Sequence, residues 1–345
     1  MNRRLTNQQI YADMLVNIDK RFLDNQISRT STLGASIMDA RSDMSGLEGF
    51  LSKASNFFSF TNMDMSDAQT KALQEGYHDQ TQAIFATVQV GYNSLVYLDL
   101  TARNEWASTL AFTKDGTSFF YPSVGLSGVL SDIFKTPADI LPFMKVRASY
   151  SEVGNAPLRY ITRNSYGINN GVLDLTAFYP AEGLKPEKTK SFEVGTNMRF
   201  WKDKINLDVT YYNSNTFNQL FRIEAGASSR YSYLYLNAGK VNNWGFEVAL
   251  GYRDSFGPVS WRTNLTYSLN RNKIKELVPE GTIDPSTGES MSRNSFIVSA
   301  NGSYRMELHE GQPMGDIYVS TLRKDDNGYV HVDGDSGAVT ADPQN

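Results

Sequence analysis

Apolar and polar side chains alternate with a period of two along four consecutive segments between residues 189 and 271. Successive side chains of a β-strand point to opposite faces, so each segment is predicted to be a strand with one apolar and one polar face. The apolar positions are Phe192, Val194, Met198 and Phe200; Ile205, Leu207, Val209 and Tyr211; Phe246, Val248, Leu250 and Tyr252; and Val259, Trp261, Leu265, Tyr267 and Leu269. Many such strands in one chain form a soluble sandwich, or a membrane barrel with lipid outside and water inside.

Composition narrows the class of protein. The 19 Tyr, 19 Phe and 26 Gly among 345 residues are typical of a β-rich chain. No run of about 18 apolar residues occurs, which excludes a transmembrane helix. The net charge is −4 and no Lys/Arg cluster is present, so a nucleic-acid partner is not expected. The absence of cysteine excludes disulfides, thiolate metal sites and cysteine nucleophiles.

About ten strands are predicted, and their connections alternate between short and long. The strands are expected at 13–20, 28–39, 82–91, 94–106, 118–130, 143–154, 189–201, 204–221, 233–252 and 258–272. The short connections fall near 21–27, 91–94, 201–204 and 254–258, and 131–142 belongs with them and contains a helical turn. The long connections fall at 40–81, 107–117, 155–188, 222–232 and from 273 onward. This alternation indicates an all-β, antiparallel up-and-down transmembrane barrel with short periplasmic turns and long outer loops, and disfavours a Greek-key sandwich.

Two local patterns refine this prediction. Tyr92, Phe200, Tyr252 and Trp261 lie beside short turns on the apolar parity of their strands, which predicts an aromatic girdle at one lipid interface. The alternative is the general abundance of aromatic residues in strands. Ser66 as N-cap, Gln69 and the following Gly76 predict a short helix over 66–75.

Seven sequence strings carry a family resemblance. They are YLDLTARNEWASTL (97–110), FFYPSVGLSGVLSDIF (119–134), LPFMKVRASYSEVGN (141–155), GLKPEKTKSFEVGTNMRFW (183–201), INLDVTYYNSNTFNQL (205–220), LNAGKVNNWGFEVAL (236–250) and EGQPMGDIY (310–318). In this order they resemble the SusC/RagA family of TonB-linked outer-membrane proteins. The resemblance implies a plugged barrel of the 22-stranded type. It also implies uptake of oligosaccharides or peptides, a SusD-like surface lipoprotein as partner, and TonB acting on the plug.

The resemblance also sets an expectation for domain content. Residues 1–345 are expected to be a partial TonB-dependent-receptor-type barrel, a middle-to-late piece of about ten strands of the 22-stranded type. The signal peptide, the plug domain and the C-terminal closing strands are expected to be absent from it. Open edges in lipid leave backbone groups unpaired, so the piece by itself is expected neither to insert nor to transport.

The polar parity supplies candidate lumen-facing residues. They are Arg147, Glu193, Arg199, Asp208, Glu247 and Arg262. One interpretation is a lumen that holds solutes and contacts a plug, and the other is a solvated interior with ion pairs across strands. Tyr231, Tyr233 and Tyr235 lie at the predicted outer rim, where tyrosine rings either contact a sugar or peptide ligand or simply pack at strand ends.

Signals for catalysis, cofactors or metals are weak. None of His78, His309 and His331 belongs to a metal-binding motif, and no G-x-S-x-G elbow occurs. The acidic segments Asp325–Gly328 and Asp333–Asp335 lack EF-hand spacing and are predicted to be plain turns. No catalytic residue, cofactor or metal is therefore expected. A non-transporting outer-membrane adhesin or glycan-binding barrel is the alternative to the importer. A soluble β-sandwich binding module is a third possibility, and it requires the apolar stripes to be buried.

Overall fold

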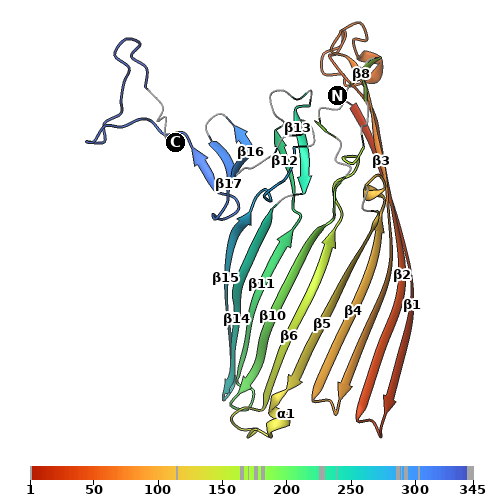
Figure 1. Cartoon of the computed structure of the whole chain (residues 1–345), viewed down its shortest axis with the longest axis vertical. Helices are drawn as coiled ribbons and strands as arrows, with labels where there is room; N and C mark the ends of the chain where they lie inside the picture. Colours follow the sequence, from red (N-terminus) through yellow and green to blue (C-terminus); the bar gives the residue numbers. More distant parts are fainter. Residues whose placement is uncertain are drawn as a thin grey trace.

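The computed structural model describes residues 2–113, 116–163, 167–169, 171–174, 178–179, 183–224, 229, 231–237, 239–284, 288, 290, 294–301 and 304–339. Ten strands form one antiparallel sheet in the order β1-β2-β3-β4-β5-β6-β10-β11-β14-β15. The strands of this sheet are β1 (Asn2–Phe22), β2 (Ile27–Glu48), β3 (Lys71–Tyr92), β4 (Val96–Ala107), β5 (Ser118–Val129), β6 (Phe143–Asn155), β10 (Glu187–Phe200), β11 (Ile205–Phe217), β14 (Lys240–Phe256) and β15 (Val259–Glu276). Figure 1 shows them as a single layer of tilted strands. The predicted up-and-down all-β arrangement is confirmed.

The remaining elements are short and lie mostly in the long connections. They are β7 (Gly167–Asn169), β8 (Val172–Asp174), β9 (Phe178–Tyr179), β12 (Leu220–Glu224), β13 (Tyr233–Asn237), β16 (Ser295–Asn301), β17 (Tyr304–His309) and β18 (Ile317–Val319), with α1 (Leu130–Phe134) and two 3-10 turns at Phe60–Asn62 and Ser108–Leu110. They form three small sheets, β12-β13-β9, β16-β17-β18 and β7-β8. No helix among the described residues is long and apolar enough to cross a membrane.

Short and long connections separate to opposite ends of the sheet, as predicted. The short turns and α1 lie at the bottom of Figure 1, and the small sheets lie at the top. The tight turns use left-handed backbone at Leu23–Asn25, at Asn93 and Ser94, and at Trp201–Asp203. Gly257, with φ of 62°, closes the β14–β15 turn, a conformation that glycine adopts without steric cost.

Three sequence predictions need correction, apart from the lengths of β1, β2 and β3. The helix expected over 66–75 is wrong, because β3 begins at Lys71 and pairs with β2 from the Lys71–Glu48 pair onward. Its capping residues make Asx turns instead: the Asp64 carboxylate accepts hydrogen bonds from Ser66, and the Asp67 carboxylate accepts one from the Gln69 amide. Pairing along the whole of β2 thus overrides a local capping pattern. In addition, β1, β2 and β3 are longer than predicted.

The other two corrections concern the strands predicted at 204–221 and 233–252, since each is divided in two. Asn218, with φ of 56°, separates β11 from β12, and Gly239, with φ of 86°, separates β13 from β14. Left-handed backbone ends the extended conformation at both places. The tall strands therefore bend into a separate rim sheet instead of continuing upward.

The register of the ten strands defines two faces. The apolar face carries Phe192, Val194, Leu207, Val209, Val248, Leu250 and Leu265, as cross-strand pairs such as Val194–Tyr211, Val209–Val248 and Leu250–Leu265 require. The polar face is the opposite one, and carries Arg147, Glu193, Asp208 and Glu247. Phe192 is 47% exposed and Leu265 is 63% exposed, so no second layer buries the apolar face. A sandwich is thereby excluded.

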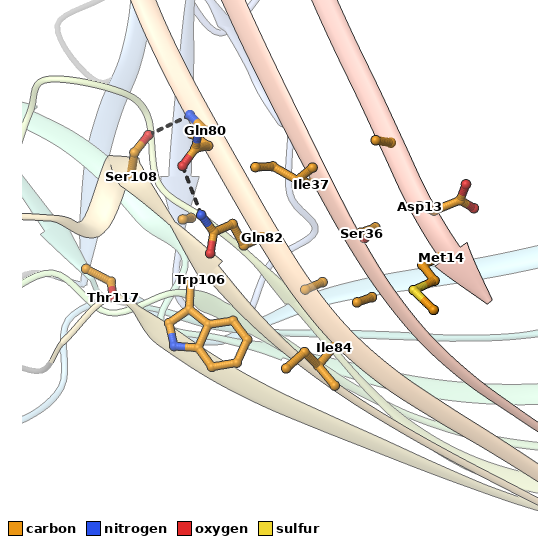
Figure 2. Close-up of a pocket in the computed structure, with 14 residues that line it drawn as sticks. Asp13, Met14, Ser36, Ile37, Gln80, Gln82, Ile84, Trp106, Ser108 and Thr117 are labelled. Carbon is orange, nitrogen blue, oxygen red and sulfur yellow. Dashed lines mark hydrogen bonds between the residues drawn. The ribbon is translucent and has the colours of Figure 1, made fainter. Parts of the chain in front are cut away.

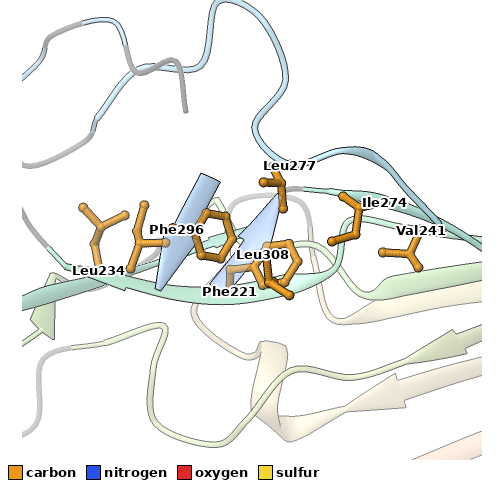
Figure 3. Close-up of a cluster of buried hydrophobic side chains, with 8 residues drawn as sticks. Phe221, Leu234, Val241, Ile274, Leu277, Phe296 and Leu308 are labelled. Carbon is orange, nitrogen blue, oxygen red and sulfur yellow. The ribbon is translucent and has the colours of Figure 1, made fainter. Parts of the chain in front are cut away.

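The largest buried cluster lies at the loop end, not within the wall of strands. Its members are Phe221, Ile223, Leu234, Val241, Ile274, Leu277, Phe296 and Leu308, from β12, β13, the ends of β14 and β15, the following loop, β16 and β17 (Figure 3). The Phe221 and Phe296 rings meet edge to face, with centroids 4.9 Å apart. Burial of each such side chain contributes about 1.5–3 kcal/mol, which fixes β12-β13 and β16-β17 onto the top of β14 and β15.

Candidate functional site

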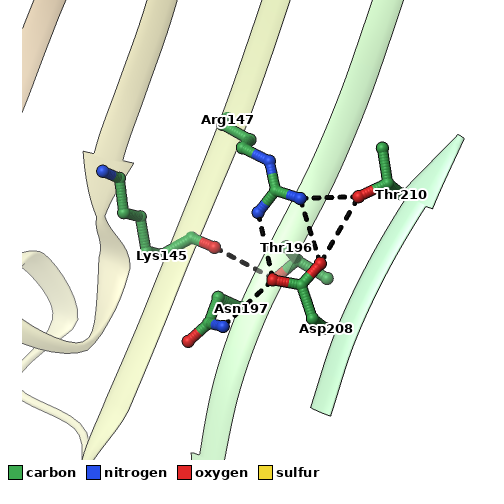
Figure 4. Close-up of polar contacts among 6 residues, drawn as sticks. All are labelled: Lys145, Arg147, Thr196, Asn197, Asp208 and Thr210. Atoms are coloured by element: carbon green, nitrogen blue, oxygen red, sulfur yellow. Dashed lines mark hydrogen bonds and ion pairs between the residues drawn. The ribbon is translucent and has the colours of Figure 1, made fainter. Parts of the chain in front are cut away.

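An ion pair on the polar face joins β6 to β11 across β10. Arg147 Nη2 lies 3.0 Å from Asp208 Oδ1 and donates to Thr210 Oγ1 at 2.6 Å, and Arg147 Nη1 donates to Asp208 Oδ2 at 3.3 Å (Figure 4). Asn197 donates a further hydrogen bond to Asp208 Oδ2 at 3.0 Å. Gly195 lies between the two strands, and a Cβ there would stand 3.0 Å from the Arg147 guanidinium carbon. A glycine at this position therefore leaves room for arginine to cross β10.

The same network borders a hollow on the polar face. Arg147, Asp208, Thr210 and Glu247 line a cavity of about 340 Å³ with backbone and side chains of β14 and β15. The Arg147 and Asp208 side chains are 43% and 34% exposed. Water therefore screens this ion pair, so the pair contributes little to the free energy of folding. Its main role is to fix the positions of hydrogen-bond donors and acceptors on the polar face.

Of the other predicted lumen-facing residues, Glu193 borders this network, and Arg199 and Arg262 lie apart from it. Glu193 pairs with Ser149 and Tyr212, on the polar face toward the loop end. Arg199 lies at the short-turn end, 3.7 Å from Asp203 and 4.8 Å from the Phe143 ring centroid. Arg262 stands opposite Arg253 near the β14–β15 turn. The structure thus brings together Arg147, Asp208 and Glu247, places Glu193 beside Arg147, and separates this group from Arg199 and Arg262.

A second polar network was missed by the sequence reasoning. Arg103 on β4 donates to Glu105 at 2.8 Å and to the Tyr121 hydroxyl on β5 at 2.8 Å, and Tyr121 in turn donates to Glu105 at 2.8 Å. The Arg103 guanidinium also lies 5.5 Å from the Phe85 ring centroid. The signal was present in the sequence, because Arg103 and Glu105 continue the polar parity of Asp99 and Thr101, opposite to Leu98, Leu100 and Ala102.

All three rim tyrosines contact aromatic side chains of β9, and two of them contact each other. Phe178 contacts Tyr233 and Tyr235, with ring centroids 6.0 and 5.7 Å apart, and Tyr179 contacts Tyr231 at 5.3 Å. Tyr233 and Tyr235 also touch edge to face. Burial, together with the neighbouring Tyr233, raises the pKa of Tyr235 above its ordinary value, so its hydroxyl stays protonated and can donate a hydrogen bond.

Beside these rings lies a cavity of about 580 Å³. It is lined by Asp79, Thr109, Pro157, Leu158, Arg159, Tyr160, Ile161, Phe178 and Tyr235. Arg159 and Asp79 form an ion pair at 2.7 Å across its wall, and Arg159 stacks 3.5 Å from the Tyr77 ring centroid. The cavity offers apolar surface, a fixed cation, a carboxylate and phenol groups, the mixture that binds polar oligomers with apolar parts.

Over the described residues, the short-turn end of the apolar face carries aromatic side chains, and its middle is mostly hydrocarbon. Tyr92, Phe200 and Tyr252 lie at the short-turn ends of β3, β10 and β14, and Trp261 lies near the start of β15. Two of these aromatics carry local hydrogen bonds: Tyr252 with Asp254 at 3.2 Å and Trp261 with Thr263 at 2.7 Å. Over β1 to β4 the face has an open hollow of about 850 Å³, where Met14, Ile37, Ile84 and Trp106 surround alanines (Figure 2). Its lining is mostly apolar and holds no charged cluster.

Comparison with known proteins supplies the identity of this wall of strands. The family model described as TonB dependent receptor-like, beta-barrel, matches residues 3–338. The chain belongs to this family. TonB-dependent receptor P3 of Formosa agariphila is 27% identical over 259 residues, which are 70% of this chain and 24% of that protein. TonB-dependent receptor P39 of the same organism is 22% identical over 74% of this chain and 23% of its own length. The chain spans about a quarter of these relatives.

Solved structures show the same fold for this TonB-dependent receptor barrel. The RagAB peptide transporter superposes with a TM-score of 0.78 at 16% identity, covering 99% of this chain and 37% of that one. The outer membrane transporter YddB from Escherichia coli gives 0.54 at 11% identity over 79% of this chain and 34% of its own. The first of these likenesses supports the SusC/RagA resemblance at the level of the fold.

Membership of this family indicates which environment each face of the sheet contacts. The chain is part of a TonB-dependent receptor β-barrel of the outer membrane. In such barrels the apolar stripe faces lipid and the alternate stripe faces the interior. The exposed apolar face and the ion-paired polar face of this receptor barrel segment therefore follow from its position between lipid and water.

Proposed function

We propose that this chain forms barrel wall of an importer that takes up peptides or oligosaccharides with energy from TonB. The observation that carries the proposal is the match of 99% of the chain to the RagAB peptide transporter at a TM-score of 0.78. A SusD-like lipoprotein on the loop side is the partner proposed by the same likeness. The polar face, with Arg147, Glu193, Arg199, Asp208, Glu247 and Arg262, lines the interior that solutes and a plug occupy.

The rim cavity supports a ligand-contact role for the tyrosines. Tyr235 lines the cavity beside the Arg159–Asp79 ion pair, and Phe178 joins it to Tyr233. An ion pair held at the wall can exchange partners with peptide termini or acidic side chains, while the rings stack on sugar faces or apolar side chains. Tyr231, Tyr233 and Tyr235 are therefore the proposed rim contacts. Tyr92, Phe200, Tyr252 and Trp261 are the proposed girdle at the periplasmic interface.

Uptake assays test this function directly. Cells that depend on the complete receptor should grow on a peptide mixture or on an oligosaccharide as sole nutrient, and lose that growth when TonB is removed. Tyr235→Ala is expected to raise the half-saturating nutrient concentration several-fold, because one wall of the cavity is lost. Tyr329→Ala, which removes an exposed loop ring, is the matched control.

The outcomes separate import from adhesion. Ligand binding at the cell surface without TonB-dependent uptake would identify a glycan-binding adhesin and reject the importer. Equal uptake by the Tyr235→Ala and Tyr329→Ala receptors would remove the rim cavity from the ligand path while leaving import itself intact.

A further inference from the structure

Five basic side chains form a row on the apolar face at its loop end. They are Lys188 and Lys190 on β10, Lys240 on β14, and Arg271 and Lys273 on β15, here called the basic collar. The register places them on this face, because Lys188 and Lys240 both pair with Phe217, Arg271 pairs with Trp244, and Lys273 pairs with Asn242. The next residues on the same face toward the opposite end are Phe192 after Lys190 and Leu269 after Arg271, and Leu269 pairs with Phe246. All three belong to the lipid-facing stripe.

The collar lies at one level above the girdle. Lys188 is twelve residues from Phe200, Lys240 is twelve from Tyr252, and Lys273 is twelve from Trp261. At about 3.4 Å per residue and a tilt of about 40°, twelve residues rise roughly 31 Å. The hydrocarbon core of a bilayer is about 30 Å thick. The three lysines therefore reach the headgroup layer of the outer leaflet together, on the side that faces lipid and not the lumen.

Local contacts hold the collar outward and leave it with a surplus of positive charge. The Lys190 and Lys240 ammonium groups lie 5.9 and 5.2 Å from the Phe217 ring centroid, one on each neighbouring strand. Glu152 accepts ion pairs from Lys188 at 3.1 Å and Lys190 at 3.3 Å. Glu276 pairs with Lys240 across a bulge. Five cations face two carboxylates, which leaves a net charge of about +3 at a lipid interface.

Neutral donors lie between these charges. Asn242 is buried and donates to Asn213 at 2.8 Å and to Asn215 at 3.2 Å, so these amides form a fixed polar floor at the same level. A floor of amides bordered by ammonium groups, above an apolar stripe and below the loops, matches an anionic headgroup with its acyl chains on the stripe. A soluble ligand in the lumen does not reach this face.

We propose that the basic collar binds the phosphate groups of anionic lipids in the outer leaflet. This lipid site is separate from nutrient import, and the proposal does not depend on which substrate is imported. The complete receptor would be reconstituted in nanodiscs of phosphatidylcholine with 0 to 30% phosphatidic acid, and bound phosphatidic acid would be counted by native mass spectrometry. The test variant is Lys188→Gln/Lys240→Gln/Lys273→Gln. The control, Lys53→Gln/Arg323→Gln/Lys324→Gln, removes the same charge from exposed loop positions outside the sheet.

The wild-type and control receptors are expected to retain phosphatidic acid. The test variant is expected to bind it at least about tenfold more weakly, because each cation near an anionic surface adds to the binding affinity. High salt should weaken wild-type binding in the same direction. Heat-modifiable gel mobility establishes folding, and Lys240→Gln alone serves if the triple variant fails to assemble. Binding of the test variant within twofold of wild type overturns the proposal. So does equal loss in the control. Unchanged lipid binding with loss of a co-purifying protein subunit would assign the surface to that subunit instead.

Discussion

The two faces of the sheet use the same backbone for opposite purposes. On the polar face Arg147, Asn197, Asp208 and Thr210 satisfy one another through hydrogen bonds that span three strands. On the apolar face, at the same height, Val194, Val209 and Val248 have no polar atoms to satisfy. One residue of register separates the two environments. The comparison shows that the ten-stranded sheet is stable only between lipid and water. Water on both sides would expose the apolar face, and lipid on both sides would leave the polar face without hydrogen-bond partners.

Both faces change character at the loop end. On the polar parity, Val241 and Ile274 become buried apolar residues, because β12, β13, β16 and β17 cover them. On the apolar parity, Lys240 and Lys273 replace hydrocarbon at the same level. At this level the polar face becomes apolar and the apolar face becomes charged, so the lipid environment ends here and the covered rim begins.

The largest effect is expected from reversing the character of one residue on the apolar face. Val248→Arg should cost roughly 2–4 kcal/mol of folding free energy, the value for a cation near the bilayer midplane. Glu247→Gln, one residue away on the polar face, should leave assembly nearly unchanged, since it remains beside the Arg147 hollow. The two variants are compared by their folded fraction in outer membranes, measured by heat-modifiable gel mobility. Equal tolerance, or greater damage from Glu247→Gln, means that the parity assignment is wrong.

A smaller effect is expected from adding one methyl group to the polar face. A Cβ at Gly245 would collide with the Leu269 carbonyl oxygen and lie 2.7 Å from the Tyr212 hydroxyl, which donates to Asn270 at 3.2 Å. Gly245→Ala should therefore destabilise the barrel by about 1–3 kcal/mol through overpacking. At Gly125, on the same face, the nearest atom is 3.5 Å away, so Gly125→Ala is the tolerated control. Unfolding temperature of the reconstituted receptor measures both, and similar values for the two variants would contradict the close packing at β14.

The smallest effect concerns the ion pair itself. A double-mutant cycle of Arg147→Met and Asp208→Asn should give a coupling of about 0.5–1 kcal/mol, because both side chains are partly exposed and water screens them. The Lys202–Asp139 pair at the short-turn end is 3.3 Å apart with side chains 71% and 78% exposed, and its coupling should be close to zero. Denaturant unfolding of the wild type and of the two single variants and the double variant of each pair supplies the energies. A coupling for Arg147 and Asp208 no larger than that of the control would show that the network contributes no order to the polar face.

The sequence alone determined the wall of strands. Alternation with a period of two, tight-turn residues such as Asn93 and Gly257, and the alternation of short and long connections predict ten antiparallel strands and their two faces. These signals are local, because each depends on residues that are close in sequence within one hairpin. They can therefore be recognised without knowledge of the folded structure. The parity of Arg147, Asp208 and Glu247 follows in the same way.

Only the tertiary structure decided what happens across strands and above them. The meeting of Arg147 with Asp208 depends on the pairing of β6, β10 and β11 and on the space at Gly195. The helix expected over 66–75 gave way to β3, because pairing with β2 satisfies more backbone groups than one capped turn. The rim cavity, the cluster around Ile274 and the alignment of Lys188, Lys240 and Lys273 join residues far apart in sequence. Non-local contacts of this kind have no signature in a local pattern, since they arise when strand register and loop packing bring separate segments to one level.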